Sequence, residues 1–332
     1  RIEPTQTAPP SPTLTPLPTT TAPCPVVEQG GLISELDRIA GLLPGPGSQG
    51  MILPDEDQLA AWEQVLGAIA GGSLQDACNL IQAHGLPYQL VRFTDLPFQD
   101  DEVLLLREQE PLAAGWGTYV FRPRARRDLV IEVPHPLEDS YTRGEGITLF
   151  RELGAKALLV AGAHRCADDA YSTCGGTTIV CGQVEPYRVS DVAHSVRTPF
   201  HAAHRVWADC RSATIVLQLH GNNLDTCPDL FVSNGTRRPG DLARAVARNA
   251  GRQCAPLTVD LADGSPEHEC GFLGYRAQAA YTLACSGSAE GEACPDAPTR
   301  SDGPDRYLSL EQSPALRLGF ACLVLALDDA LP

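Results

Sequence analysis

The stretch Leu129-Val-Ile-Glu-Val-Pro-His-Pro-Leu-Glu-Asp139 decides how the fold of the chain is interpreted. Its apolar run predicts a buried β-strand that ends at Pro134. His135, Glu138 and Asp139 follow within one turn's reach. An imidazole and a carboxylate three residues apart can bind one zinc ion, and open α/β sheets place their sites at the C-terminal ends of their strands. The stretch therefore predicts a strand end that is competent to bind metal.

Two later apolar runs end in the same way. Thr214-Ile-Val-Leu-Gln-Leu219 leads directly into His220, and Tyr307-Leu-Ser-Leu310 leads into Glu311. Helical and strand-like patterns alternate from residue 129 to the C-terminus. This alternation predicts an α/β fold, in which helices cover both faces of a mostly parallel or mixed sheet.

The sequence before this region divides into two parts. Residues 1–25 are almost all Pro, Thr, Ser and Ala, a composition that cannot bury a core, so they predict an extended stalk or linker. Such a stalk would tether the protein to a cell surface, and a disordered tail without a role explains the composition equally well. Residues 26–114 mix helical and strand-like patterns and predict a small N-terminal α+β lobe. We expect residues 115–332, which carry the three polar strand ends, to form the catalytic domain.

The net charge of −16 excludes two classes of partner. Nucleic acids and anionic membranes would both repel so acidic a chain, so we expect neither as a partner. No apolar run reaches the length of a transmembrane helix, and we expect no membrane insertion within this chain.

The cysteine content indicates an oxidising compartment. The chain has 12 cysteines and no C-x-x-C spacing, a pattern typical of disulfides in an exported, extracellular or cell-surface protein. Cys285 and Cys294 bracket a loop and form a plausible pair. Cys78 and Cys322 lie in apolar, helix-like segments and are candidates for buried free thiols.

The three strand ends together supply the parts of a catalytic zinc site. Such a site needs three protein ligands and one open position for water. His135, Glu138 and His220 form one candidate set, with Asp139 as the alternative carboxylate. Glu311 would transfer the proton of the attacking water to a leaving amine. A capping carboxylate before the helix that begins at Ser313 is the competing interpretation of Glu311.

Several other side chains are candidates for contacts with substrate. Arg165 follows the apolar run 157–161 and would hold an oxyanion or clamp a substrate carboxylate. His164, His194 and His201 are candidate substrate contacts. For each we also expect a simpler role: a salt-bridged loop start for His164 and Arg165, a loop-to-helix cap around Asp191 and His194, and a surface or core-edge position for His201.

The order of these motifs resembles a known family. Pro-His-Pro-Leu-Glu, then Leu-Gln-Leu-His-Gly, then Leu-Ser-Leu-Glu-Gln are similar, in that order, to segments of the N-formylglutamate amidohydrolase family, which is related in fold to the zinc carboxypeptidases. The resemblance covers about residues 115–325. It implies that His135, Glu138 and His220 bind Zn²⁺ and that Glu311 is the base.

Two departures from the family pattern affect the expected substrate contacts. Arg165 lies where the family carries an Asn-Arg pair for anion binding, but the preceding residue here is His164. The interval from His135 to His220 (220 minus 135, or 85 positions) is shorter than in typical carboxypeptidases. We therefore expect different substrate loops.

The resulting hypothesis is an extracellular zinc-dependent hydrolase that cleaves a linear amide or peptide bond. An N-acyl amino acid, a peptide, a cell-wall peptide or a γ-glutamyl polymer would be the substrate. The alternatives are a catalytically degenerate cell-surface binding module on the same fold, or a metal-dependent deacetylase-like hydrolase.

Overall fold

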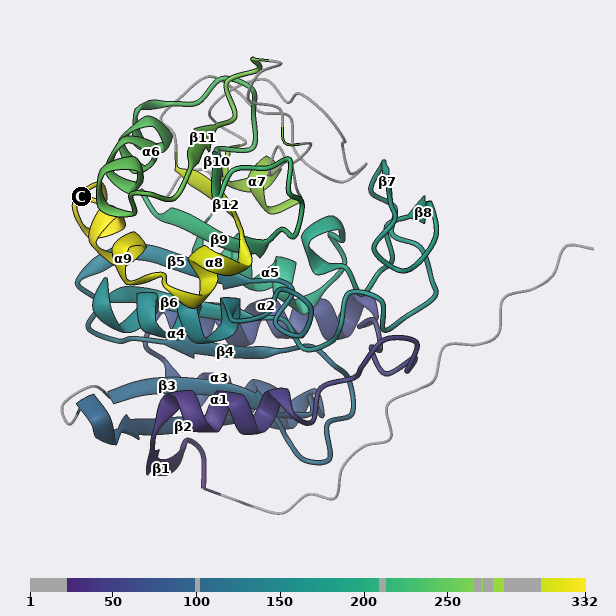
Figure 1. Cartoon of the computed structure of the whole chain (residues 1–332). Coiled ribbons are helices and arrows are strands. Elements are labelled where there is room, and N and C mark those ends of the chain that lie inside the picture. Colours follow the sequence, from purple (N-terminus) through teal and green to yellow (C-terminus); the bar gives the residue numbers. More distant parts are fainter. Residues whose placement is uncertain (1–22, 99–101, 209–212, 266–269, 271–276, 284–305) are drawn as a thin grey trace, which may run out of the picture.

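The computed structural model describes residues 23–98, 102–208, 213–265, 270, 277–283 and 306–332 (Figure 1). Its centre is a ten-stranded mixed sheet in the order β1-β2-β3-β4-β6-β5-β9-β12-β10-β11. The strands of this sheet are β1 (Val26–Gly30), β2 (Tyr88–Asp95), β3 (Glu102–Glu108), β4 (Thr118–Phe121), β5 (Arg127–Val133), β6 (Ala155–Val160), β9 (Ile215–Gly221), β10 (Leu230–Ser233), β11 (Val259–Leu261) and β12 (Tyr307–Gln312). A separate two-stranded sheet pairs β7 (Thr177–Thr178) with β8 (Glu185–Pro186).

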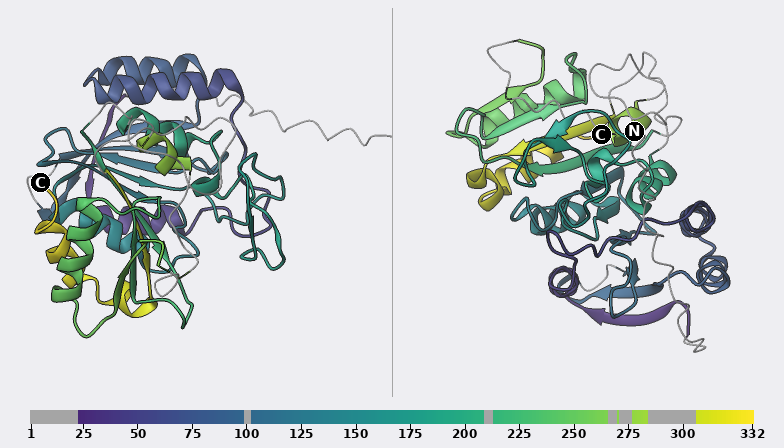
Figure 2. Two further views of the ribbon diagram at one scale, coloured as in Figure 1. Left: turned by 90° about the horizontal axis from the view of Figure 1, so that it is seen from above. Right: turned by 90° about the vertical axis from the view of Figure 1, so that its right-hand side faces the viewer.

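Helices cover both faces of the large sheet. The helices of the described residues are α1 (Leu32–Ala40), α2 (Glu56–Ala70), α3 (Leu74–Ala83), α4 (Thr142–Glu152), α5 (Pro199–Trp207), α6 (Asp241–Gln253), α7 (Ala277–Thr282), α8 (Pro314–Leu318) and α9 (Ala321–Asp328). Residues of α1, α4, α6, α8 and α9 share one hydrophobic core, and residues of α2, α3, α5 and α7 share the other. Figure 2 shows α2 and α3 on the opposite side of the sheet from α1 and α9.

The middle of the sheet is parallel. β6, β5, β9 and β12 are neighbours in this order and run in the same direction. The antiparallel strands β4 and β10 flank this parallel block. The C-terminal ends of β5, β9 and β12 therefore meet at one edge of the sheet, as expected for an α/β site.

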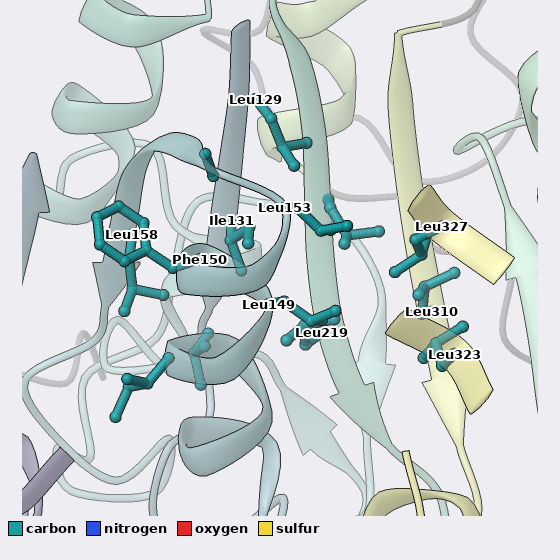
Figure 3. Close-up of a cluster of buried hydrophobic side chains, with 14 of the residues drawn as sticks. Leu129, Ile131, Leu149, Phe150, Leu153, Leu158, Leu219, Leu310, Leu323 and Leu327 are labelled. Carbon is teal, nitrogen blue, oxygen red and sulfur yellow. The ribbon is translucent and has the colours of Figure 1, made fainter. Parts of the chain in front are cut away.

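Residues of the central strands alternate between the two cores. Leu129 and Ile131 of β5 pack on the side of α4, together with Leu219 of β9 and Leu310 of β12 (Figure 3). Val130 and Val216 pack on the opposite side, which α5 covers. Because side chains in a strand alternate with period two, the polar residues between the leucines face α5.

The predicted fold class is confirmed: the chain forms an α/β fold with a large mixed sheet between helices. Strands β1, β2 and β3 of the expected N-terminal lobe extend this same sheet through β4. The boundary at residue 114 stays a prediction. The helix expected at Ser313 is α8: the Ser313 side chain caps it by accepting a hydrogen bond from the Leu316 backbone N–H, and Pro314 is the first helical residue.

The disulfides correct one expectation. Cys78 and Cys322 are not free thiols: Cys78 pairs with Cys24, and Cys322 pairs with Cys254. Their helical neighbourhood gave no sign of partners that are 54 and 68 positions away. The structure also pairs Cys166 with Cys181 and Cys227 with Cys270, and no cysteine is free in the described ranges.

Other expectations fall outside the ranges that the structure describes. They concern the Cys285–Cys294 pair and nearly all of the N-terminal stalk. In the described part of the chain, no helix combines the length and the apolar character needed to cross a membrane.

Candidate metal centre

The C-terminal ends of β5, β9 and β12 bring three predicted site residues to one place. His220 and Glu311 are direct register partners on the adjacent parallel strands β9 and β12. His135 follows β5 by two residues and lies 5.0 Å from His220, measured between ring centroids. All three side chains are buried. The sheet therefore assembles residues that are up to 176 positions apart in the sequence (311 minus 135).

Two imidazoles and one carboxylate form a compact triad. Nδ1 of His135 lies 3.2 Å from Oδ2 of Asp139 and 3.3 Å from Nδ1 of His220. The third edge, from His220 Nδ1 to Asp139 Oδ2, is 3.7 Å. These atoms can hold a metal ion. A tetrahedral zinc ion with bonds of about 2.0–2.1 Å keeps its ligand atoms about 3.3 Å apart, so the spacing fits zinc.

The outer nitrogens of both imidazoles face acceptors. Nε2 of His135 lies 3.0 Å from Oδ1 of Asp191, and Nε2 of His220 lies 2.7 Å from Oε1 of Gln218. When each Nε2 carries the proton of a neutral ring, both Nδ1 atoms present lone pairs to the same point as the Asp139 carboxylate. Metal-binding histidines commonly donate their other N–H to such acceptors. The donor set thus fits a divalent cation.

Without a metal, the same groups can instead be held together by a protonated His135. Burial and the nearby Arg165 lower the pKa of His135, but Asp191 and Asp139 outweigh them and raise it above its ordinary value. A protonated His135 would then bridge the two carboxylates. Burial lowers the pKa of His220, which favours its neutral, ligand-competent form. Metal binding at the triad would therefore release a proton from His135.

The structure separates the two carboxylates that competed as ligands. Asp139 is buried and contacts both imidazoles, and these contacts outweigh its burial, so its pKa lies well below the ordinary value. Glu138 is 28% exposed and pairs with Arg165 at 3.5 Å. The identity of the ligand stays a prediction, and the geometry favours Asp139.

Arg165 reaches the site through a carboxylate. Its Nε and Nη2 donate to Oδ2 of Asp191 at 3.0 and 2.5 Å. The other oxygen of Asp191 contacts His135, so Arg165 and His135 hold one carboxylate between them. The Cys166–Cys181 disulfide begins at the residue after Arg165 and anchors this loop. Arg165 is thus near the triad, but a carboxylate already neutralises its charge.

Asp191 is the main residue whose role the sequence did not reveal. We expected it to cap the following helix, and its side chain forms no capping hydrogen bond. It is instead buried between His135 and Arg165. No local pattern indicated this position, because the partners lie 56 and 26 residues away.

The three predicted substrate histidines occupy different surroundings. His164 is half-buried and accepts a hydrogen bond from the Cys166 backbone N–H. His194 is buried and stacks on Tyr187 with 3.3 Å between ring centroids. His201 is buried in α5 and forms an edge-to-face contact with Tyr281. The surface position that we considered for His201 is therefore wrong, and the substrate roles of all three stay predictions.

Arg317 joins the two segments that carry the triad. Its Nη1 donates to the carbonyl of Ser140, and its Nη2 donates to Oδ1 of Asn223 at 2.9 Å. A Cβ on Gly221 would lie 2.5 Å from Nη1, so a larger residue beside His220 would displace this guanidinium. The sequence indicated a helix that begins at Ser313, but nothing in it indicated this contact.

Comparison with solved structures finds similar folds at low identity. An N-formylglutamate amidohydrolase from Ralstonia eutropha is 16% identical, with 64% of this chain and 94% of that chain covered and a TM-score of 0.35. A bacteriophage poly-gamma-glutamate hydrolase is 13% identical, with 65% and 89% covered and a TM-score of 0.31. A metallo-carboxypeptidase from Burkholderia cenocepacia is 12% identical, with 84% and 69% covered and a TM-score of 0.31. No family model and no curated protein matches the chain.

Proposed function

We propose that this protein is a zinc-dependent hydrolase of linear amide or peptide bonds. The observation that carries the proposal is the triad of Asp139, His135 and His220, whose three ligand atoms lie 3.2, 3.3 and 3.7 Å apart beside Glu311. When bound, zinc would polarise the scissile carbonyl and lower the pKa of the attacking water.

Glu311 is the proposed proton carrier of the reaction. It lies beside His220 in the parallel register of β9 and β12, and its negative charge acts to raise the pKa of His220. A carboxylate at this place can accept a proton from the attacking water and give it to the leaving nitrogen. Both transfers are needed, because an amine leaves only after protonation.

Arg165 and Asp191 have a supporting role in this mechanism. Asp191 accepts from Nε2 of His135 and thereby turns Nδ1 toward the metal position. Arg165 donates to Asp191, and its positive charge compensates the buried negative charge of this carboxylate. Its proposed second role is to steady the negative charge of the substrate.

The proposed setting is extracellular, and the substrate is a peptide, an N-acyl amino acid or a γ-glutamyl polymer. The four disulfides described above support an oxidising compartment. The Pro/Thr-rich segment 1–25 would tether the protein to a cell surface. The motif order Pro-His-Pro-Leu-Glu, Leu-His-Gly and Leu-Glu-Gln supports amide chemistry by its resemblance to amidohydrolases.

A catalytically inactive binding module is the second candidate, and the burial of the site favours it. His135 is 2% exposed, and His220 and Glu311 are each 3% exposed. Two cavities, of about 580 and 500 Å³, are lined by other residues. In such a module the metal would stabilise the fold and a different surface would bind the ligand.

The experiment combines a metal measurement with hydrolysis. Zinc content of the purified full chain is measured by mass spectrometry, and turnover is measured on a panel of N-acyl amino acids, linear peptides and γ-glutamyl oligomers. We expect one zinc per chain, and we expect Glu311→Gln to lower turnover by about 10²- to 10⁴-fold. The exposed Glu152→Gln is the matched control and should keep wild-type turnover.

Three outcomes are informative. A chain that binds no zinc contradicts the hydrolase proposal. Bound zinc without turnover on the whole panel supports the binding module. Turnover confined to N-acetylated substrates supports a deacetylase-like reaction at the same metal.

A further inference from the structure

A row of buried polar side chains lies on the α5-facing side of the sheet, next to the metal triad. Glu132 of β5 and Gln218 of β9 are register partners on adjacent strands, and both side chains are fully buried. Gln218 contacts His220, which is two residues further along the same strand and on the same face. Neither Glu132 nor Gln218 belongs to the triad.

Hydrogen bonds fix the orientation of the Gln218 amide. Its Nε2 donates to Oε2 of Glu132 at 2.9 Å, and its Oε1 accepts from the hydroxyl of Tyr307 at 2.7 Å. A carboxylate only accepts hydrogen bonds, so the NH₂ group must face Glu132 and the carbonyl must face His220. The second oxygen of Glu132 contacts Nδ1 of His204 at 2.6 Å, which holds the carboxylate from its other side.

The orientation of this amide determines which nitrogen of His220 carries the proton. A carbonyl oxygen 2.7 Å from Nε2 requires a proton on Nε2. A neutral imidazole with Nε2–H has its lone pair on Nδ1, the atom that faces Asp139 and His135. The opposite amide orientation would favour the proton on Nδ1 and block metal binding.

We propose that Glu132 is a positioning residue that sets the metal-binding tautomer of His220 through Gln218, an inference that rests on the metal site proposed above. Reversal of the amide in the wild-type protein would bring two donors together at His220 and two acceptors together at Glu132. The buried carboxylate therefore acts on the metal through one intervening amide, without contact to any triad atom.

The substitution Glu132→Gln tests this role because it keeps the shape of the side chain. The new amide can donate to Gln218, which allows the Gln218 amide to reverse and its NH₂ to face His220. We expect the proton of His220 to move to Nδ1 in part of the molecules. Zinc affinity should fall by about 10- to 100-fold, the range for a residue behind a metal ligand.

A charge-preserving exchange distinguishes positioning from structural support. In the double variant Glu132→Gln/Gln218→Glu, the glutamine at 132 donates to the new carboxylate at 218, whose other oxygen again accepts from Nε2–H of His220. We expect this variant to regain the wild-type tautomer and most of the zinc affinity. If the role of Glu132 were only structural, there would be no reason for zinc affinity to recover in the double variant.

Two measurements are made on the full chain. Nitrogen-15 NMR of labelled histidines reports the tautomer in the metal-free protein, with the His220 signal identified by its loss in His220→Ala. Competition against a chelator gives the dissociation constant of zinc. Exposed Glu152→Gln serves as the control for loss of one carboxylate.

The outcomes separate this inference from the proposed function. Wild-type tautomer and affinity in Glu132→Gln overturn it, as does a double variant that stays as weak as the single one. If Glu132→Gln does not fold, the double variant decides in the same way: Nε2–H with near wild-type zinc affinity supports the role, and Nδ1–H overturns it. A wild-type chain that binds no zinc contradicts the proposed function, whereas the tautomer still tests the role of Glu132.

Discussion

The two faces of the central strands differ sharply, although they alternate residue by residue along the same segments. The side of α4 receives Leu129 and Ile131 of β5 and Leu219 of β9, all within one hydrophobic core (Figure 3). The side of α5 receives Glu132 and Gln218 and leads to His220. One face is apolar and contributes stability by burial. The other face also packs apolar residues such as Val130 and Val216, but it carries Glu132 and Gln218 toward the strand ends, where polar groups orient one another.

The largest expected effect concerns the polar face. Asp139→Asn should weaken zinc binding more than about 100-fold, because it removes a proposed ligand charge and even residues behind a ligand cost 10- to 100-fold. Glu138→Gln, its neighbour and matched control, should change zinc affinity only a few-fold. Chelator competition measures both. A larger loss of zinc affinity in Glu138→Gln than in Asp139→Asn would make Glu138 the ligand and contradict the proposed assignment.

The apolar face predicts loss of stability without loss of metal affinity. Leu219→Ala removes a fully buried side chain between Gln218 and His220, and we expect the free energy of unfolding to fall by about 2–5 kcal/mol. Zinc affinity should stay near wild type while the protein is folded. Urea unfolding measures the loss of stability, and chelator competition measures the zinc affinity.

The control for this substitution is Leu325→Ala on α9. Leu325 is 56% exposed, so its loss should change the free energy of unfolding by less than about 0.5 kcal/mol. A Leu219→Ala variant with native stability and weakened zinc binding would show that the two faces are not separate in function.

Glu145 is an exception on the apolar side, and its predicted effect depends on pH. This carboxyl of α4 is fully buried, accepts from Gln312 and has its pKa raised to about 8 by burial. Between its ordinary pKa and about 8, the unfolded chain loses this proton while the folded chain keeps it. The stability contribution is therefore present at low pH and is lost as pH rises through this window.

Glu145→Gln should remove this pH dependence. From pH 5 to pH 8, the wild type should lose free energy of unfolding relative to the variant, by a few kcal/mol and at most about 5 kcal/mol at 1.36 kcal/mol per pKa unit. Urea unfolding of both proteins at the two pH values gives this difference. Equal pH dependence in both would contradict a neutral, buried Glu145.

Much of the fold could be predicted from local patterns. The runs that became β5, β9 and β12 are rich in aliphatic residues, and the strand ends carry His135, His220 and Glu311. Periodicity reports burial, and alternation of strands with helices reports a sheet covered on both faces. The capping of α8 by Ser313 could also be predicted, because caps are local.

The remaining features depend on contacts between distant segments. Asp191 joins His135 and Arg165 across a loop, and Cys78 and Cys322 find partners that no spacing indicated. The choice between Glu138 and Asp139 depends on how the turn after β5 directs each carboxylate. Sequence spacing alone makes both possible.

The sequence by itself therefore determined the element types, the edge of the sheet at which the polar residues gather, and the chemistry of those residues. The tertiary structure decided which carboxylate meets the two imidazoles, that Arg165 is neutralised by Asp191, and how Glu132 acts through Gln218. The physical reason is the distance along the chain over which each interaction acts. Burial periodicity and capping act within a few residues, whereas hydrogen-bond direction at a buried site depends on groups that only the folded chain brings together.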